Sequence, residues 1–107
     1  MERLETATTM FVVLWEFEVK RGSEVAFEKE YGRGGVWAEF FRQDPAYRET
    51  RLLRDMGRQR RFYTLDVWAS RAAYEAFRER CREEYARIDA QCEALTAKET
   101  PMGTFES

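Results

Sequence analysis

The stretch 61–77 holds the residues that are best placed to do chemistry. Residues 61–68 mix β-branched, aromatic and aliphatic side chains and predict a strand that is buried on both faces. Ser70 follows as a candidate helix N-cap, and from Tyr74 onward apolar residues recur at helical spacing. Trp68 is therefore expected where a central strand ends and a long helix begins, a position at which ligand pockets often open.

Other residue types that commonly carry catalysis or bind metals are scarce. The chain has no histidine, which excludes His-dependent triads, His-ligated zinc and His-ligated haem. Cys81 and Cys92 fall in one predicted helix, roughly 16 Å apart by helical rise, so they are expected to be buried free thiols, and no metal site is expected. Three glycines in 32–35 suggest a phosphate-binding loop, but no Lys-Ser/Thr follows them, so a kink or flexible loop is expected.

Composition narrows the class of protein. The 107 residues are 44% hydrophobic and 36% charged, which fits one globular domain, expected at 11–106 after a loose terminus at 1–10. The net charge of −2 gives no basic field for nucleic acid. No apolar run approaches the roughly 20 residues of a membrane helix, and the charged start does not resemble a signal peptide, so a cytoplasmic protein is expected.

Periodicity predicts the elements that must position these residues. The helix at 71–95 has the clearest signal, a continuous apolar stripe, while the first helix begins after a candidate N-cap at Ser23 and is interrupted at 32–35. A turn at 57–60 makes the second and third strands antiparallel neighbours. The expected elements are strands at 11–19, 47–56, 61–68 and 101–105 and helices at 24–41 and 71–95, with Gly103 a candidate bulge in the last strand.

The order β-α-β-β-α-β predicts an α+β, ferredoxin-like fold, an antiparallel sheet with two helices on one face. Val12 and Leu14 are apolar on the face that no helix covers. A second copy of the sheet would cover this face, and the sequence therefore predicts a homodimer.

Three segments resemble the antibiotic biosynthesis monooxygenase family of dimeric α/β barrels: 11–22 (FVVLWEFEVKRG), 47–55 (YRETRLLRD) and above all 63–74 (YTLDVWASRAAY). The resemblance covers 11–106. It implies a dimer of ferredoxin-like halves, each with a pocket between sheet and helices. Members of the family include cofactor-independent monooxygenases that oxidise phenolic polyketides to quinones, haem-degrading oxygenases, and proteins without established chemistry.

The haem-degrading activity does not carry over to this chain. Trp68 matches the tryptophan that ends the third strand and lines the family's pocket. Trp15, however, falls where the haem-degrading members have a pocket asparagine, and their ligating histidine would fall near Phe77 or Arg78, where there is none. No cofactor is therefore expected.

The remaining activity needs a site that binds an aromatic ring, favours its anion and excludes water, because an electron-rich phenolate must pass an electron to dioxygen. Arg51 is the candidate to stabilise the phenolate or the forming superoxide, and Asp66 or Tyr63 the candidate to move a proton, beside Trp68. The expected ring-binding residues are Trp15, Phe17, Trp37, Phe41 and Phe77.

Structural interpretations of these residues stay open. The tryptophans and Phe41 are also typical core residues, Tyr63 is compatible with a structural role, and Asp66 could pair with Arg51 or Arg54 across the hairpin. Three functions therefore remain. The first is a cofactor-independent monooxygenase acting on a small aromatic, phenolic or quinol-like compound. The second is a non-catalytic, ligand-binding or structural homodimer, and the third is a haem or other oxidative enzyme with divergent ligands.

Overall fold

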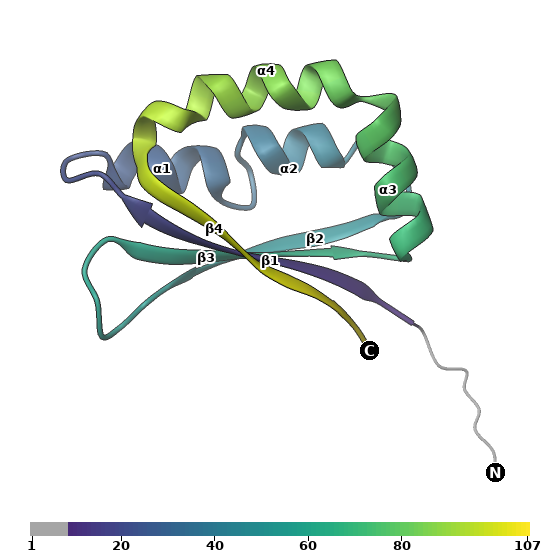
Figure 1. Cartoon of the computed structure of the whole chain (residues 1–107), viewed down its shortest axis with the longest axis horizontal. Coiled ribbons are helices and arrows are strands. Elements are labelled where there is room, and N and C mark those ends of the chain that lie inside the picture. Colours follow the sequence, from purple (N-terminus) through teal and green to yellow (C-terminus); the bar gives the residue numbers. More distant parts are fainter. Residues whose placement is uncertain (1–8) are drawn as a thin grey trace, which may run out of the picture.

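A four-stranded antiparallel sheet with its helices on one face forms the framework of the chain (Figure 1). The computed structural model describes residues 9–107, so most of the expected loose terminus lies outside the described residues. The strands are β1 (Phe11–Val19), β2 (Tyr47–Arg54), β3 (Arg61–Trp68) and β4 (Thr96–Glu106), in the spatial order β2-β3-β1-β4. This is the strand order of the predicted ferredoxin-like fold, which is confirmed.

The register of the two central strands decides which side chains face the helices. Phe17 pairs with Phe62, Trp15 with Thr64, and Val13 with Asp66. Because successive side chains of a strand point to opposite faces, the odd positions of β1 and the even positions of β3 share the helix-covered face. The even positions of β1 and the odd positions of β3 lie on the other face, which no helix of the described chain covers (Figure 1).

The helical layer consists of two interrupted helices. The first is α1 (Glu24–Tyr31) followed by α2 (Val36–Phe41), with the break at 32–35 that the glycines predict. The second was expected to be continuous over 71–95, and this is wrong: the backbone bends at Cys81 (φ −110°, ψ 29°) and separates α3 (Arg71–Arg80) from α4 (Arg82–Cys92), which ends in a short 3₁₀ turn, η1 (Glu93–Leu95). No helix in the described part of the chain is long and apolar enough to cross a membrane.

The last strand starts at Thr96, five residues earlier than expected. Its residues are mostly exposed because β4 is an edge strand, so the apolar alternation that would have marked its beginning is missing. The bulge expected at Gly103 is confirmed, since the register of β4 against β1 shifts between Gly103 and Pro101 and Gly103 has a φ of +133°. β2 ends at Arg54 rather than Met56.

The two predicted helix caps differ in outcome. The Ser70 hydroxyl accepts a hydrogen bond from the backbone N–H of Ala73 at 3.1 Å, so this N-cap is confirmed. Ser23 stands at the N-cap position of α1, but its side chain makes no capping bond. Instead, the Glu24 carboxylate accepts a hydrogen bond from the N–H of Gly22 at 2.7 Å.

Aromatic side chains fill the space between the sheet and the helices. Trp68, Phe27 and Phe77 are completely buried. The predicted stripe of the second helix faces this core, with Phe77, Ile88 and Cys92 buried, and both cysteines are free thiols, Cys81 being half-buried. The burial of so many rings fixes the helices over the sheet and leaves a hollow near the middle of the sheet.

Candidate functional site

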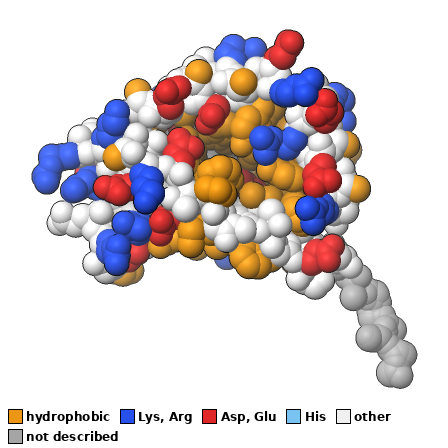
Figure 2. Space-filling view, in the orientation of Figure 1, with side chains coloured by type: hydrophobic (Ala, Val, Ile, Leu, Met, Phe, Trp, Pro, Cys, Tyr) orange, Lys and Arg blue, Asp and Glu red, His pale blue; other side chains and the backbone are white. Residues whose placement is uncertain are grey.

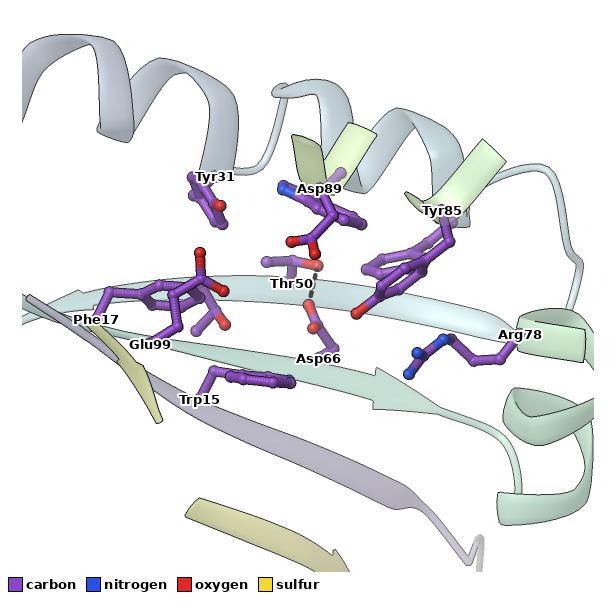
Figure 3. Close-up of a pocket in the computed structure, with 12 residues that line it drawn as sticks. Trp15, Phe17, Tyr31, Thr50, Asp66, Arg78, Tyr85, Asp89 and Glu99 are labelled. Atoms are coloured by element: carbon purple, nitrogen blue, oxygen red, sulfur yellow. Dashed lines mark hydrogen bonds between the residues drawn. The ribbon is translucent and has the colours of Figure 1, made fainter. Parts of the chain in front are cut away.

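A cavity of about 230 Å³ opens between the sheet and the helices (Figures 2 and 3). An apolar cavity of about 150 Å³ already holds a benzene molecule, so there is room for one aromatic ring with a short substituent. Figure 2 shows apolar side chains gathered around this hollow, with charged groups at its edge. The lining residues are Trp15, Phe17, Tyr31, Trp37, Phe41, Thr50, Thr64, Asp66, Arg78, Tyr85, Asp89 and Glu99.

A buried carboxylate lies on the floor of the cavity. Asp66, on β3, is only 8% exposed, and its Oδ1 accepts a hydrogen bond of 2.6 Å from the Thr50 hydroxyl of the neighbouring strand. The Thr50 oxygen lies 2.7 Å from the Tyr47 hydroxyl, and because Thr50 donates to Asp66, Tyr47 must donate to Thr50. Burial raises the pKa of Asp66 to about 6, although the Thr50 hydrogen bond acts in the opposite direction.

The second oxygen of Asp66 has no hydrogen-bond partner among the described residues. Among residues 9–107, Thr50 is the hydrogen-bond partner of Asp66, and it engages only Oδ1. Figure 3 shows the carboxylate directed from β3 into the cavity. With a pKa of about 6 and a free oxygen, this group can accept a proton from a bound molecule near neutral pH.

A guanidinium group lies at the opposite side of the cavity from β4. Arg78 of α3 stacks over the Tyr85 ring, 3.8 Å from its centroid, and donates a hydrogen bond of 2.8 Å to the Tyr74 hydroxyl. Within the described residues it has no carboxylate partner. Burial raises the pKa of Tyr85, so its ring stays neutral beneath this cation.

Two further carboxylates face the cavity from the side of β4 and α4. Glu99 pairs across the sheet with Phe17, is half-buried, and accepts a hydrogen bond of 3.1 Å from the Thr96 hydroxyl. Burial raises the pKa of Glu99, and the negative charge of Asp89 on α4 adds to this rise. Figure 3 shows the Glu99 and Asp89 side chains both pointing into the cavity.

Five of the nine site residues predicted from the sequence line this cavity: Trp15, Phe17, Trp37, Phe41 and Asp66. Trp68, at the end of β3, and Phe77, on α3, are completely buried between the sheet and the helices, and neither lines the cavity. The Trp68 ring instead packs against its aromatic neighbours, at 5.6 Å from Phe41 and 5.5 Å from Tyr47 between centroids.

Arg51 and Tyr63 lie on the other face of the sheet, away from the cavity. Arg51 is exposed and its Nε is 3.5 Å from the Glu49 carboxylate, while the Tyr63 hydroxyl donates to Glu16 at 2.9 Å. The suggested pairing of Asp66 with Arg51 or Arg54 is therefore replaced by the bond to Thr50. Tyr63 has a structural partner, as its alternative interpretation held.

Arg51 was predicted in the site because a different register of the β2–β3 hairpin was expected. A turn restricted to 57–60 would pair Arg51 with Asp66, but the observed register pairs Thr50 with Asp66. A one-residue shift moves every side chain of a strand to the opposite face, so Thr50 enters the site and Arg51 leaves it. The other residues missed were Tyr31, Thr64, Arg78, Tyr85, Asp89 and Glu99. Tyr31 and Tyr85 carried a signal, because each belongs to the apolar spacing of its predicted helix.

Comparisons with known proteins agree with this architecture. Residues 10–88 match the family model described as antibiotic biosynthesis monooxygenase. No curated protein matches the chain.

Solved structures share the fold at low sequence identity. One is a variant of SnoaB, a cofactor-independent oxygenase from Streptomyces nogalater, with 18% identity, a TM-score of 0.63 and 92% of each chain covered. A protein from Pseudomonas aeruginosa has 18% identity and a TM-score of 0.60, with 96% of this chain and 95% of that chain covered. A protein from Shewanella oneidensis has 13% identity and a TM-score of 0.63, with 94% and 93% covered. At these identities the likeness concerns the fold, and the match of the family model over most of the chain shows that this protein belongs to the antibiotic biosynthesis monooxygenase family.

Proposed function

We propose that this protein is a monooxygenase that uses no cofactor and oxidises a small phenolic or quinol-like compound with dioxygen. The observation that carries the proposal is the buried Asp66 carboxylate, which has one oxygen held by Thr50 and the other free on the floor of an aromatic cavity. Family membership and the oxygenase among its structural neighbours support the reaction type.

In the proposed reaction, the residues of the cavity would have three different roles. Trp15, Trp37 and Phe41 bind the ring and exclude water. Asp66 accepts the phenolic proton, and the resulting phenolate passes one electron to dioxygen. Arg78, rather than Arg51, is the cation on the cavity wall that would stabilise the superoxide as it forms.

The reaction balances without any further reactant. Superoxide and the aryl radical combine to form one C–O bond, and Asp66 returns its proton to the peroxide. Loss of water breaks the O–O bond and a C–H bond and leaves a quinone. One phenol and one dioxygen thus give one quinone and one water, with a single oxygen atom inserted into the ring.

An oxygen electrode tests this proposal with methylhydroquinone as the probe. We expect oxygen uptake above the rate of autoxidation without protein, and labelled dioxygen should deliver one atom to the product and the other to water. Asp66→Asn should lower kcat about a hundredfold, the usual contribution of a general base. Glu83→Gln, on the exposed face of α4, should leave kcat unchanged. Release of hydrogen peroxide in place of ring oxygenation would contradict the proposal.

We further propose that the protein acts as a homodimer formed through the uncovered face of the sheet. Leu14 and Leu65 are paired at the centre of this face and only half-buried, and Leu53 and Phe105 are 47% and 51% exposed. Apolar surface at the centre of an uncovered sheet is stabilised when a second sheet packs on it.

A further inference from the structure

The charges that line the cavity are unbalanced and unpaired. Asp66, Asp89 and Glu99 face a single guanidinium, that of Arg78. Within residues 9–107 none of these four groups takes part in an ion pair, although they surround one cavity. Asp66 is buried and Glu99 half-buried, while Asp89 stands at the exposed rim. Proteins rarely leave buried or half-buried charges without partners, so the unpaired Asp66 and Glu99 indicate that a bound molecule supplies the missing positive charge.

The two kinds of charge are separated along the cavity. Glu99 of β4 pairs with Phe17 of β1, and Asp66 of β3 pairs with Val13 of β1. Phe17 and Val13 are four residues apart, so the two pairs are separated by roughly 13 Å along β1. Figure 3 shows Glu99, Phe17 and Tyr31 together at one end and Arg78 with Tyr85 at the other. The cavity therefore has an acidic end at Glu99 and a basic end at Arg78, with Asp66 between them.

The acidic end has the composition of an ammonium site. Aromatic rings attract cations through their quadrupoles. Phe17 and Tyr31 pack against each other, with ring centroids 4.9 Å apart, and both rings line the cavity beside Glu99. A carboxylate and two rings together are suited to a protonated amine. The same end disfavours a carboxylate or phosphate, which would meet Glu99 and Asp89 at short range.

We infer that the compound bound here is a phenol that carries a protonated amino group, with the ammonium at the Glu99 end and the phenolic oxygen near Asp66 and Arg78. This inference rests on the proposed function for the position of the phenol and adds the class of substrate. Asp66 is more than nine-tenths buried, and its free oxygen marks where the phenolic proton is received.

Three phenols with short para substituents of different charge test the inference by isothermal titration calorimetry near neutral pH. They are tyramine (ammonium), para-ethylphenol (neutral) and para-hydroxyphenylpropionate (carboxylate). We expect tyramine to bind at least about tenfold more tightly than para-ethylphenol, and para-hydroxyphenylpropionate to bind most weakly. Equal or tighter binding of para-hydroxyphenylpropionate, or no binding of any of the three, would overturn the inference.

Substitutions then locate the ammonium. Glu99→Gln keeps the size of the side chain and should weaken tyramine about tenfold, while the affinity for para-ethylphenol changes by less than about twofold. Asp89→Asn, at the exposed rim, should act in the same direction, and Glu83→Gln on the outer face of α4 serves as the matched control. Equal weakening of all three phenols by both site variants would indicate a structural effect and overturn the inference.

The outcome is separable from that of the proposed oxygenase reaction. Oxygen uptake with neutral methylhydroquinone but no preference for tyramine would overturn only the ammonium site. A clear preference for tyramine without oxygen uptake on any phenol would overturn only the oxygenase.

Discussion

A single buried carboxylate, that of Asp66, links the stability of this protein to its proposed chemistry. Asp66 has a pKa of about 6 in the folded chain, against an ordinary value of 3.8, because burial penalises its charge. The difference between these two pKa values corresponds to about 3 kcal/mol of unfolding free energy. The folded state binds the proton more tightly, so this contribution is complete below the ordinary pKa and is lost as the pH rises through about 6.

The raised pKa of Asp66 gives the first prediction. Asp66→Asn removes the charge without changing the size, so it should raise Tm relative to the native chain at about pH 8 and lose most of this advantage at about pH 4. Asp66 shares the lining of the cavity with Thr50, Arg78, Tyr85 and the carboxylates of Asp89 and Glu99. The expected gain at about pH 8 is about 3 kcal/mol, the cost that burial places on the charge of Asp66. Thermal unfolding followed by circular dichroism across this pH range measures it. The same gain at both pH values would contradict the assignment of a raised pKa to Asp66.

Thr50 is the second residue with a distinct test. Thr50→Val keeps the shape but leaves Asp66 and Tyr47 without their shared partner, which should cost about 1–3 kcal/mol in urea unfolding. Because the Thr50 bond lowers the pKa of Asp66, its loss should move the rising limb of the pH–activity profile to higher pH. Thr50→Ser retains the hydroxyl and should restore both properties. A Val variant with an unshifted pH profile would show that Asp66 is not the titrating base.

At the scale of elements, two glycines in the break of the first helix, Gly32 and Gly35, have no room for a side chain, and Gly35 has the least. A Cβ at Gly35 would collide with the backbone carbonyl of Glu30, whereas a Cβ at Gly34 would meet nothing within 4 Å. Gly35→Ala should therefore cost about 1–3 kcal/mol, and Gly34→Ala, one residue away, should be close to neutral. Urea unfolding of the two variants makes the comparison. Equal stability would mean that α1 and α2 can shift relative to each other without cost.

The elements also show how far the sequence predicts this molecule. Strands β1 and β3 and helices α1 and α2 follow from apolar periodicity and glycines, because burial leaves a repeating pattern. The bend at Cys81 and the start of β4 at Thr96 leave no such pattern, since the apolar stripe continues through the bend and the edge strand is exposed. The residues of the site could not all be predicted either. Whether Thr50 or Arg51 enters the site depends on a one-residue difference in the hairpin register, which composition does not encode.

At the scale of the whole molecule, the two faces of the sheet differ in what covers them. Helices and the cavity occupy one face, and the other exposes apolar side chains around the Leu14–Leu65 pair. If a second copy covers this face, the isolated protein should have twice the 12.8 kDa mass of one chain in size-exclusion chromatography with light scattering.

A charge at the centre of that face should separate the copies without unfolding them. Leu65→Lys places an ammonium where two sheets would meet, so the mass should fall to 12.8 kDa, while a half-exposed lysine is tolerated within one chain. Val25→Lys is the matched control, because Val25 is 84% exposed on α1, away from the sheet face, and should leave the mass unchanged. A native chain that is monomeric, or a Leu65→Lys variant that keeps the doubled mass, would contradict a dimer formed through this face.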